Sequence, residues 1–187
     1  MNKNIEEMEI IIQNINKYDI LISITPYYAY LIMKGDKTVE VRKFHITDPR
    51  WSGNVKAYVT KDRKSLKRMP EADRVEFEKY MGKVAFGFDK GGVMCEEALH
   101  MRHGLKDSCL THEELDNYGK GKPLYGYRVT ALKIYDKPRE LGEFYRCSDG
   151  KCQSYNCKSK YCGIVIECGN LEQLTRPPQN YIKIMEV

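Results

Sequence analysis

Residues 25–43 read TPYYAYLIMKGDKTVEVRK and contain the start of a helix, its end and a strand. A threonine followed by a proline is typical of a helix N-terminus, because the hydroxyl can cap the helix and proline suits its first position. Gly35 suits the left-handed conformation at which many helices end. The alternation over residues 38–44 predicts a strand with Val39 and Val41 on one face and polar side chains on the other.

Strands and helices also flank this stretch. Residues 19–24, DILISI, are rich in β-branched side chains and predict a strand before the helix. An amphipathic helix is expected over residues 4–17. Further strands are predicted over residues 54–60, 82–89, 125–135 and 181–185, and helices over 65–81 (broken near Pro70), 96–103 and 111–118. This order predicts an α+β fold, a small mixed β-barrel or curled sheet with peripheral helices.

No linker divides the chain, so its 187 residues predict a single domain. Within it we expect an N-terminal helix (1–18), the barrel (19–145), a cysteine-rich C-terminal insertion (146–170) and a closing strand (171–187). Hydrophobic residues make up 42% of the chain, as in a globular protein. The sequence has no apolar run of about 18 residues and no secretory signal pattern, so we expect a cytoplasmic protein without a membrane span.

Positive charge is concentrated in one part of the chain. Residues 34–68 contain eleven Lys or Arg against four Asp or Glu, whereas residues 69–119 contain six against eleven. This asymmetry predicts a surface for a polyanion such as nucleic acid. A basic loop that only faces solvent explains it equally well.

The motif that leads into the strand resembles a known family. It reads Gly35-Asp36-Lys37-Thr38-Val39-Glu40-Val41-Arg42-Lys43. With the preceding strand and the proline-initiated helix, it resembles ASCH domains, a branch of the PUA-like β-barrel superfamily. The later stretch 125–141, which contains KIYDKP over residues 133–138, and the stretch 176–179 are similar to ASCH proteins of the phage and bacterial type, whereas residues 62–120 have no match in the family. The resemblance implies a PUA-like mixed barrel.

The resemblance also implies a function. ASCH domains are thought to bind RNA, often as regulators or coactivators, so we expect an RNA- or nucleotide-binding protein. One bacterial branch consists of amidohydrolases that deacetylate acetylcytidine, and it uses a lysine, a threonine three residues later and a distant glutamate. Lys37 matches that lysine, but Glu40 stands in place of the threonine. The alternative is therefore an amidohydrolase acting on a modified nucleoside, with Lys37 and Glu40 as its catalytic acid–base pair.

Lys37, Glu40 and Arg42 can form one polar group, because Glu40 and Arg42 share a strand face and Lys37 precedes the strand. Arginine offers donors that suit phosphate or a base edge, glutamate accepts from exocyclic amines, and lysine supplies a point charge. We predict a nucleic-acid-binding site here, completed by Lys43 and by Trp51 as a base-stacking residue. The alternatives are a structural ion pair between Glu40 and Arg42 on an exposed strand and a tryptophan that covers the barrel end.

Cysteines are clustered near the C-terminus. Cys147, Cys152, Cys157 and Cys162 recur at every fifth position, separated by polar, turn-prone segments. Four thiolates can surround one tetrahedral Zn²⁺, which would stabilise a segment that has no hydrophobic core of its own. Because four ligands leave no open coordination position, we predict a structural zinc. Free thiols and disulfides formed on oxidation are the alternatives.

Overall fold

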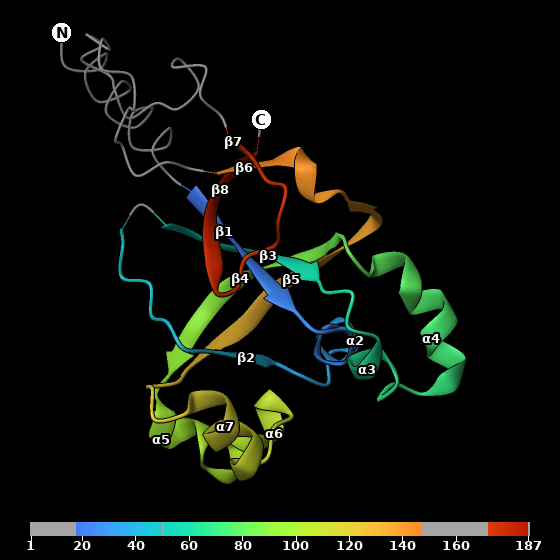
Figure 1. The fold of residues 1–187 in the computed structure, drawn as a ribbon. Helices are drawn as coiled ribbons and strands as arrows, with labels where there is room; N and C mark the ends of the chain where they lie inside the picture. Colours follow the sequence, from blue (N-terminus) through green and yellow to red (C-terminus); the bar gives the residue numbers. More distant parts are fainter. Residues whose placement is uncertain (1–17, 50, 147–171, 187) are drawn as a thin grey trace, which may run out of the picture.

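The structure, a computed structural model, describes residues 18–49, 51–146 and 172–186 and places their strands in one mixed sheet (Figure 1). The order across the sheet is β2-β5-β4-β3-β1-β8-β6-β7. β1 and β3 pair in parallel, whereas β1 and β8 are antiparallel. The strands are β1 (Tyr18–Ile24), β2 (Val39–Arg42), β3 (Trp51–Val59), β4 (Val84–Met94), β5 (Tyr125–Arg139), β6 (Phe144–Arg146), β7 (Glu172–Gln173) and β8 (Tyr181–Glu186).

The sheet is open. Over the described ranges, β2 and β7 stand at opposite ends of the strand order and do not pair with each other. The α+β class is confirmed, but the predicted barrel does not close. The outer edge of β2 meets α6 (Arg102–Ser108) instead, since the Thr38 N–H, just before the strand, donates to the Asp107 carbonyl over 2.8 Å. An edge covered in this way needs no further strand to satisfy its backbone groups.

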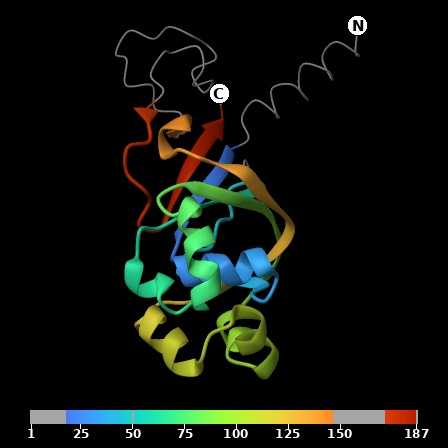
Figure 2. The ribbon, with the colours of Figure 1, turned by 90° about the vertical axis from the view of Figure 1, so that its right-hand side faces the viewer.

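The helices lie in two groups (Figures 1 and 2). The first contains α2 (Pro26–Lys34), α3 (Arg63–Leu66) and α4 (Glu71–Phe77), which is followed by the 3-10 turn η1 (Glu78–Tyr80). The second contains α5 (Glu96–Leu99), α6 and α7 (His112–Gly119), at one end of the molecule next to β2. A further 3-10 turn, η2 (Leu141–Glu143), precedes β6. None of the helices in the described ranges is long and apolar enough to cross a membrane.

The expected strand–helix–strand unit is confirmed. α2 begins at Pro26 and ends at Gly35, whose φ of 82° is left-handed as predicted. Thr25 occupies the N-cap position, but its side chain makes no capping hydrogen bond, so the predicted cap is wrong. The Ser65 hydroxyl takes this role, because it accepts a hydrogen bond of 3.0 Å from the Tyr27 N–H in the first turn. The cap thus comes from α3.

β4 and β5 are much longer than predicted, and two predicted helices are divided. β4 continues through Gly91 and Gly92, beyond the predicted end at residue 89, and β5 continues through Pro138. Register shifts between β4 and β5 accommodate these residues in the pairing. The helix expected over residues 65–81 is split into α3, α4 and η1, with Pro70 between the first two. The helix expected over residues 96–103 is split between α5 and the start of α6. The predicted helix over residues 4–17 and the cysteine-rich segment 147–170 lie outside the described residues.

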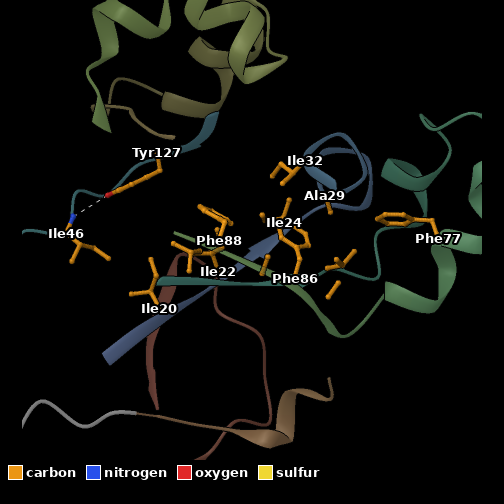
Figure 3. Close-up of a cluster of buried hydrophobic side chains, with 14 of the residues drawn as sticks. Ile20, Ile22, Ile24, Ala29, Ile32, Ile46, Phe77, Phe86, Phe88 and Tyr127 are labelled. Carbon is orange, nitrogen blue, oxygen red and sulfur yellow. Dashed lines mark hydrogen bonds between the residues drawn. The ribbon is translucent and has the colours of Figure 1, made fainter. Parts of the chain in front are cut away.

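The main hydrophobic core lies between the sheet and the first helical group (Figure 3). Ile20, Ile22 and Ile24 of β1 pack there with Phe86 of β4 and Ile32 of α2, all of them buried. A buried side chain of this size contributes about 1.5–3 kcal/mol to stability. This core fixes α2, and with it the loop that leads to β2.

The Tyr127 hydroxyl ties the segment after β2 to the sheet. It donates to the Phe44 carbonyl over 2.8 Å and accepts from the Ile46 N–H over 3.3 Å (Figure 3). The ring of Tyr127 is itself buried in the main core. The backbone after Lys43 is therefore held by a side chain of β5.

The α5–α7 unit is attached to β2 by a separate apolar cluster, formed by Val39, Val41, Met94, Leu99, Leu115 and Leu124. Gly104 lets α6 pack tightly on α5, because a Cβ there would lie 2.6 Å from the Leu99 carbonyl oxygen. The C-terminal end of α6 is thereby placed beside Lys37.

Candidate functional site

Lys37, Glu40 and Arg42 are all buried, with only 2%, 6% and 7% of each residue exposed. These three residues are called the charged triad below. The exposed strand face that we considered for Glu40 and Arg42 is therefore not present, because both faces of β2 are covered. Charged residues are almost never this buried unless they are paired. The local geometry explains how the triad is tolerated.

The Glu40 carboxylate lies between the two cations. Its Oε1 atom is 2.7 Å from an Arg42 Nη atom, and its Oε2 atom is 3.6 Å from the Lys37 Nζ atom. The strand spacing of two residues places Glu40 and Arg42 on the same face, as predicted. One carboxylate thus contacts both positive side chains and offsets one of their two charges.

Each of the two cations also donates a hydrogen bond to a backbone carbonyl. The Lys37 Nζ donates to the Ser108 carbonyl over 2.6 Å, and Arg42 donates to the Ser23 carbonyl over 2.8 Å. Ser108 is the last residue of α6, where helix carbonyls lack internal partners and carry partial negative charge. Ser23 belongs to β1. The triad itself comes from β2 and the residues just before it, and its acceptors come from β1 and from α6 of the α5–α7 unit.

The triad has an excess of positive charge when Lys37 is protonated. Burial lowers the pKa of Lys37 below its ordinary value of 10.5, an effect that Glu40 opposes and Arg42 reinforces. The Arg42 Nε atom is buried and has no hydrogen-bond partner among the described residues. A buried donor of this kind costs free energy until an acceptor reaches it. The site therefore lacks one acceptor and favours negative charge.

Tyr118 of α7 forms one rim of the triad. Burial raises the pKa of Tyr118, and the adjacent Arg42 partly offsets this increase. The Lys43 Nζ lies 4.7 Å from the centre of the Tyr118 ring, within cation–π range. Tyr118 is still 38% exposed. The predicted site residue Lys43 therefore contacts Tyr118, and Tyr118 in turn lies beside Arg42 of the triad.

Tyr28 of α2 forms the other rim. Its ring centre lies 5.2 Å from the Lys37 Nζ and 5.2 Å from the Arg68 Cζ. The Tyr28 hydroxyl donates to Glu114 over 3.1 Å, and Arg68 is 3.3 Å from the same carboxylate oxygen. Helix α7 contacts both sides of the triad. Its Tyr118 forms one side, and its Glu114, four residues earlier on the same helix face, accepts the hydrogen bond from Tyr28 on the other side.

Trp51, predicted to stack a base, lies in the main core and is 9% exposed. Its Nε1 atom donates to the Asn54 carbonyl over 3.0 Å, and its ring packs edge-on against Tyr127. The Lys90 Nζ lies 4.7 Å from the ring centre. The predicted role of Trp51 in stacking a base stays a prediction.

The basic stretch 34–68 is partly neutralised by residues from the acidic stretch that follows it. Arg63 pairs with Glu78 over 2.5 Å, and Arg68 pairs with Glu114 over 3.3 Å. Lys56 pairs with Asp19 of β1 over 3.4 Å. The local charge excess counted along the sequence therefore overstates the positive charge of the folded surface.

The predicted zinc ligands Cys147, Cys152, Cys157 and Cys162 all lie outside the described residues, so the zinc stays a prediction. Over residues 18–49, 51–146 and 172–186, no three His, Cys, Asp or Glu side chains are arranged to hold a metal ion.

Sequence reasoning missed Ser108, Glu114 and Tyr118, which come from the stretch without a family match. One local signal was present. Thr111 and Glu114 form a capping box in the structure, and their spacing is a recognisable helix start. It predicts α7 and places Glu114 and Tyr118 on one face. It contains nothing that places this face beside β2.

Comparisons with known proteins address the fold. No protein-family model and no curated protein matches the sequence. A crystal structure of the ASCH protein from Zymomonas mobilis superposes with a TM-score of 0.52 and 16% identity, over 90% of this chain and 87% of that chain. A mutant form of the same protein gives 0.52 and 14%, over 92% and 89% of the two chains. At such identities the likeness is one of fold, and the chain therefore has the fold of ASCH proteins.

Proposed function

We propose that this chain binds RNA, or a ligand that contains a nucleotide, at the charged triad. The observation that carries the proposal is the buried, unpartnered Arg42 Nε in a group of two cations and one carboxylate. A phosphate oxygen or a base acceptor would satisfy that donor and balance the charge. The ASCH fold agrees with such a role, and the cytoplasmic location and any regulatory role stay predictions.

Each residue has a distinct part in this proposal. Arg42 is already oriented by Glu40 and the Ser23 carbonyl, so the direction of its unpartnered Nε donor is fixed. Lys37 adds positive charge next to the Ser108 carbonyl, and Lys43 adds it next to the Tyr118 ring. A preorganised group of this kind loses little conformational entropy when a ligand binds.

Binding of labelled RNA and DNA oligonucleotides across a salt series tests this function. We expect affinity to fall as salt rises, because backbone contacts release counterions. Arg42→Gln is expected to weaken binding roughly 10- to 100-fold, the equivalent of about 1.5–3 kcal/mol for hydrogen bonds to a charged group. Its fold should persist, because Lys37 and Glu40 remain as a neutral pair.

Arg63→Gln is the matched control, since Arg63 is exposed and paired with Glu78 away from the triad. It should bind RNA almost as the wild type does. Lys43→Gln is a second variant, at the rim, which should weaken binding without exposing the triad. No detectable affinity of the wild type for any RNA or DNA at low salt would exclude the proposed function.

A second candidate is the amidohydrolase, which is favoured by the lowered pKa of Lys37. A lowered pKa increases the fraction of Lys37 that is neutral, and only a neutral lysine can take a proton from water. Hydrolysis of acetylcytidine consumes one water and yields cytidine and acetate, which chromatography separates. On this hypothesis the wild type converts acetylcytidine and a folded Lys37→Met variant does not. Equal turnover in the variant, or none in the wild type, would reject Lys37 as the catalytic base.

A further inference from the structure

Tyr118 is one of the few large hydrophobic side chains of the described residues that are exposed. Its position is nevertheless fixed, because α7 is held at two points. Leu115, three residues earlier, is fully buried in the cluster beneath β2, and Glu114 accepts the Tyr28 hydroxyl. A rigid aromatic ring at the surface is a platform on which a planar group can stack at low entropic cost.

Charge surrounds this ring on two sides. The Lys43 Nζ lies 4.7 Å from the ring centre, and the Arg42 guanidinium lies beside the hydroxyl. The same guanidinium carries the Nε that has no hydrogen-bond partner among the described residues. An aromatic face next to cationic donors matches a nucleotide, whose base stacks while its phosphate accepts hydrogen bonds.

We infer that Tyr118, Lys43 and Arg42 form a subsite for one unstacked nucleotide, in which the base takes the place of the Lys43 ammonium over the Tyr118 ring and its phosphate contacts Lys43 and Arg42. The inference rests on the proposed function and adds to it the class of ligand, a single-stranded nucleic acid or free nucleotide rather than a duplex. A base inside a duplex has both faces covered by its neighbours. The subsite also moves the aromatic role from Trp51 to Tyr118.

Tyr80 provides a matched control. The Lys79 Nζ lies 4.9 Å from its ring centre, so the local pair of tyrosine and lysine is nearly the same. Tyr80 lies in η1, which follows α4, and packs against Phe77. It has the cation and the ring but not the buried arginine.

The test compares two labelled single strands of about eight nucleotides, one with bases and one abasic with the same backbone. We expect the wild type to bind the first strand more tightly. Tyr118→Leu should weaken binding of that strand by about 5- to 150-fold, the range for loss of one stacking contact, and leave abasic binding unchanged. Tyr118→Phe keeps the ring and should stay close to wild type, as should Tyr80→Leu.

The outcomes separate the two proposals. If the wild type binds the strand with bases and Tyr118→Leu binds it equally well, the subsite is wrong and the proposed function stands. Equal losses for both strands would also overturn stacking, because the ring would then act through the backbone or the fold. If the wild type binds neither strand nor a free nucleotide, both proposals fail. Thermal unfolding of each variant verifies that it is folded.

Discussion

Glu40→Gln is expected to lower the free energy of unfolding by about 3–5 kcal/mol, the cost of removing one partner from a buried ion pair. The substitution keeps the shape of the side chain and removes its charge. Lys37 and Arg42 would then remain buried without a carboxylate between them. Urea unfolding at neutral pH, followed by circular dichroism, measures the change.

The loss should depend on pH in a defined direction. Burial lowers the pKa of Lys37, so between that lowered pKa and 10.5 the unfolded chain binds more protons than the native chain. Stability from this group therefore rises with pH across this window and is constant below it. Without Glu40 the pKa falls further, so the rise should extend to lower pH. Adding Lys37→Met to Glu40→Gln should recover part of the loss, because one buried cation is removed.

Glu78→Gln is the matched control for this prediction. It also removes a carboxylate from an arginine pair, but the side chains of Arg63 and Glu78 are 68% and 47% exposed. The expected cost is roughly 0–1 kcal/mol. Equal losses in the two variants would contradict the desolvated triad on which the proposed function depends.

Alkaline pH is expected to destabilise the protein strongly between about pH 10 and 12. Burial raises the pKa of Tyr18 and of Tyr127 from 10.0 to about 12. In this window the unfolded chain loses both phenolic protons while the native chain keeps them, so stability falls as pH rises. Below pH 10 the two states bind equal numbers of these protons. The expected loss at pH 12 is roughly 2–3 kcal/mol for each tyrosine.

Tyr127→Phe isolates one of these contributions. At neutral pH it should cost about 1–3 kcal/mol, because the Ile46 N–H loses its acceptor and the Phe44 carbonyl its donor. Between pH 10 and 12 it should lose less stability than the wild type. Ile46→Val, in the same loop, keeps the phenol and should show the full alkaline loss. An identical alkaline slope in all three proteins would show that Tyr127 does not carry it.

The sequence predicted those parts of the fold that depend on local chemistry. Pro26 and Gly35 marked the ends of α2 correctly, and the alternation from Val39 to Arg42 marked β2. The cap was misassigned because its hydroxyl comes from Ser65, which is distant in sequence. The long pairing of β4 with β5 was missed because bulges, which carry no simple pattern, accommodate Gly91 and Gly92.

The candidate site likewise has parts that a local motif indicates and parts that depend on distant residues. Lys37, Glu40 and Arg42 were found because a short motif contains them. Their burial was not, because it depends on helices that the sequence could not place against β2. Tyr118 and Ser108 lie next to the triad only because of that packing. The role of Trp51 was inferred from its neighbours in sequence, whereas the fold turns its ring into the core.

The bond from Lys37 to the Ser108 carbonyl joins residues 71 positions apart. The anchoring charges therefore come from β2, while the rim and one acceptor come from the helical segment inserted between β4 and β5. On the proposed function, changes in that segment would alter which ligand is selected without changing the sheet that holds the charges.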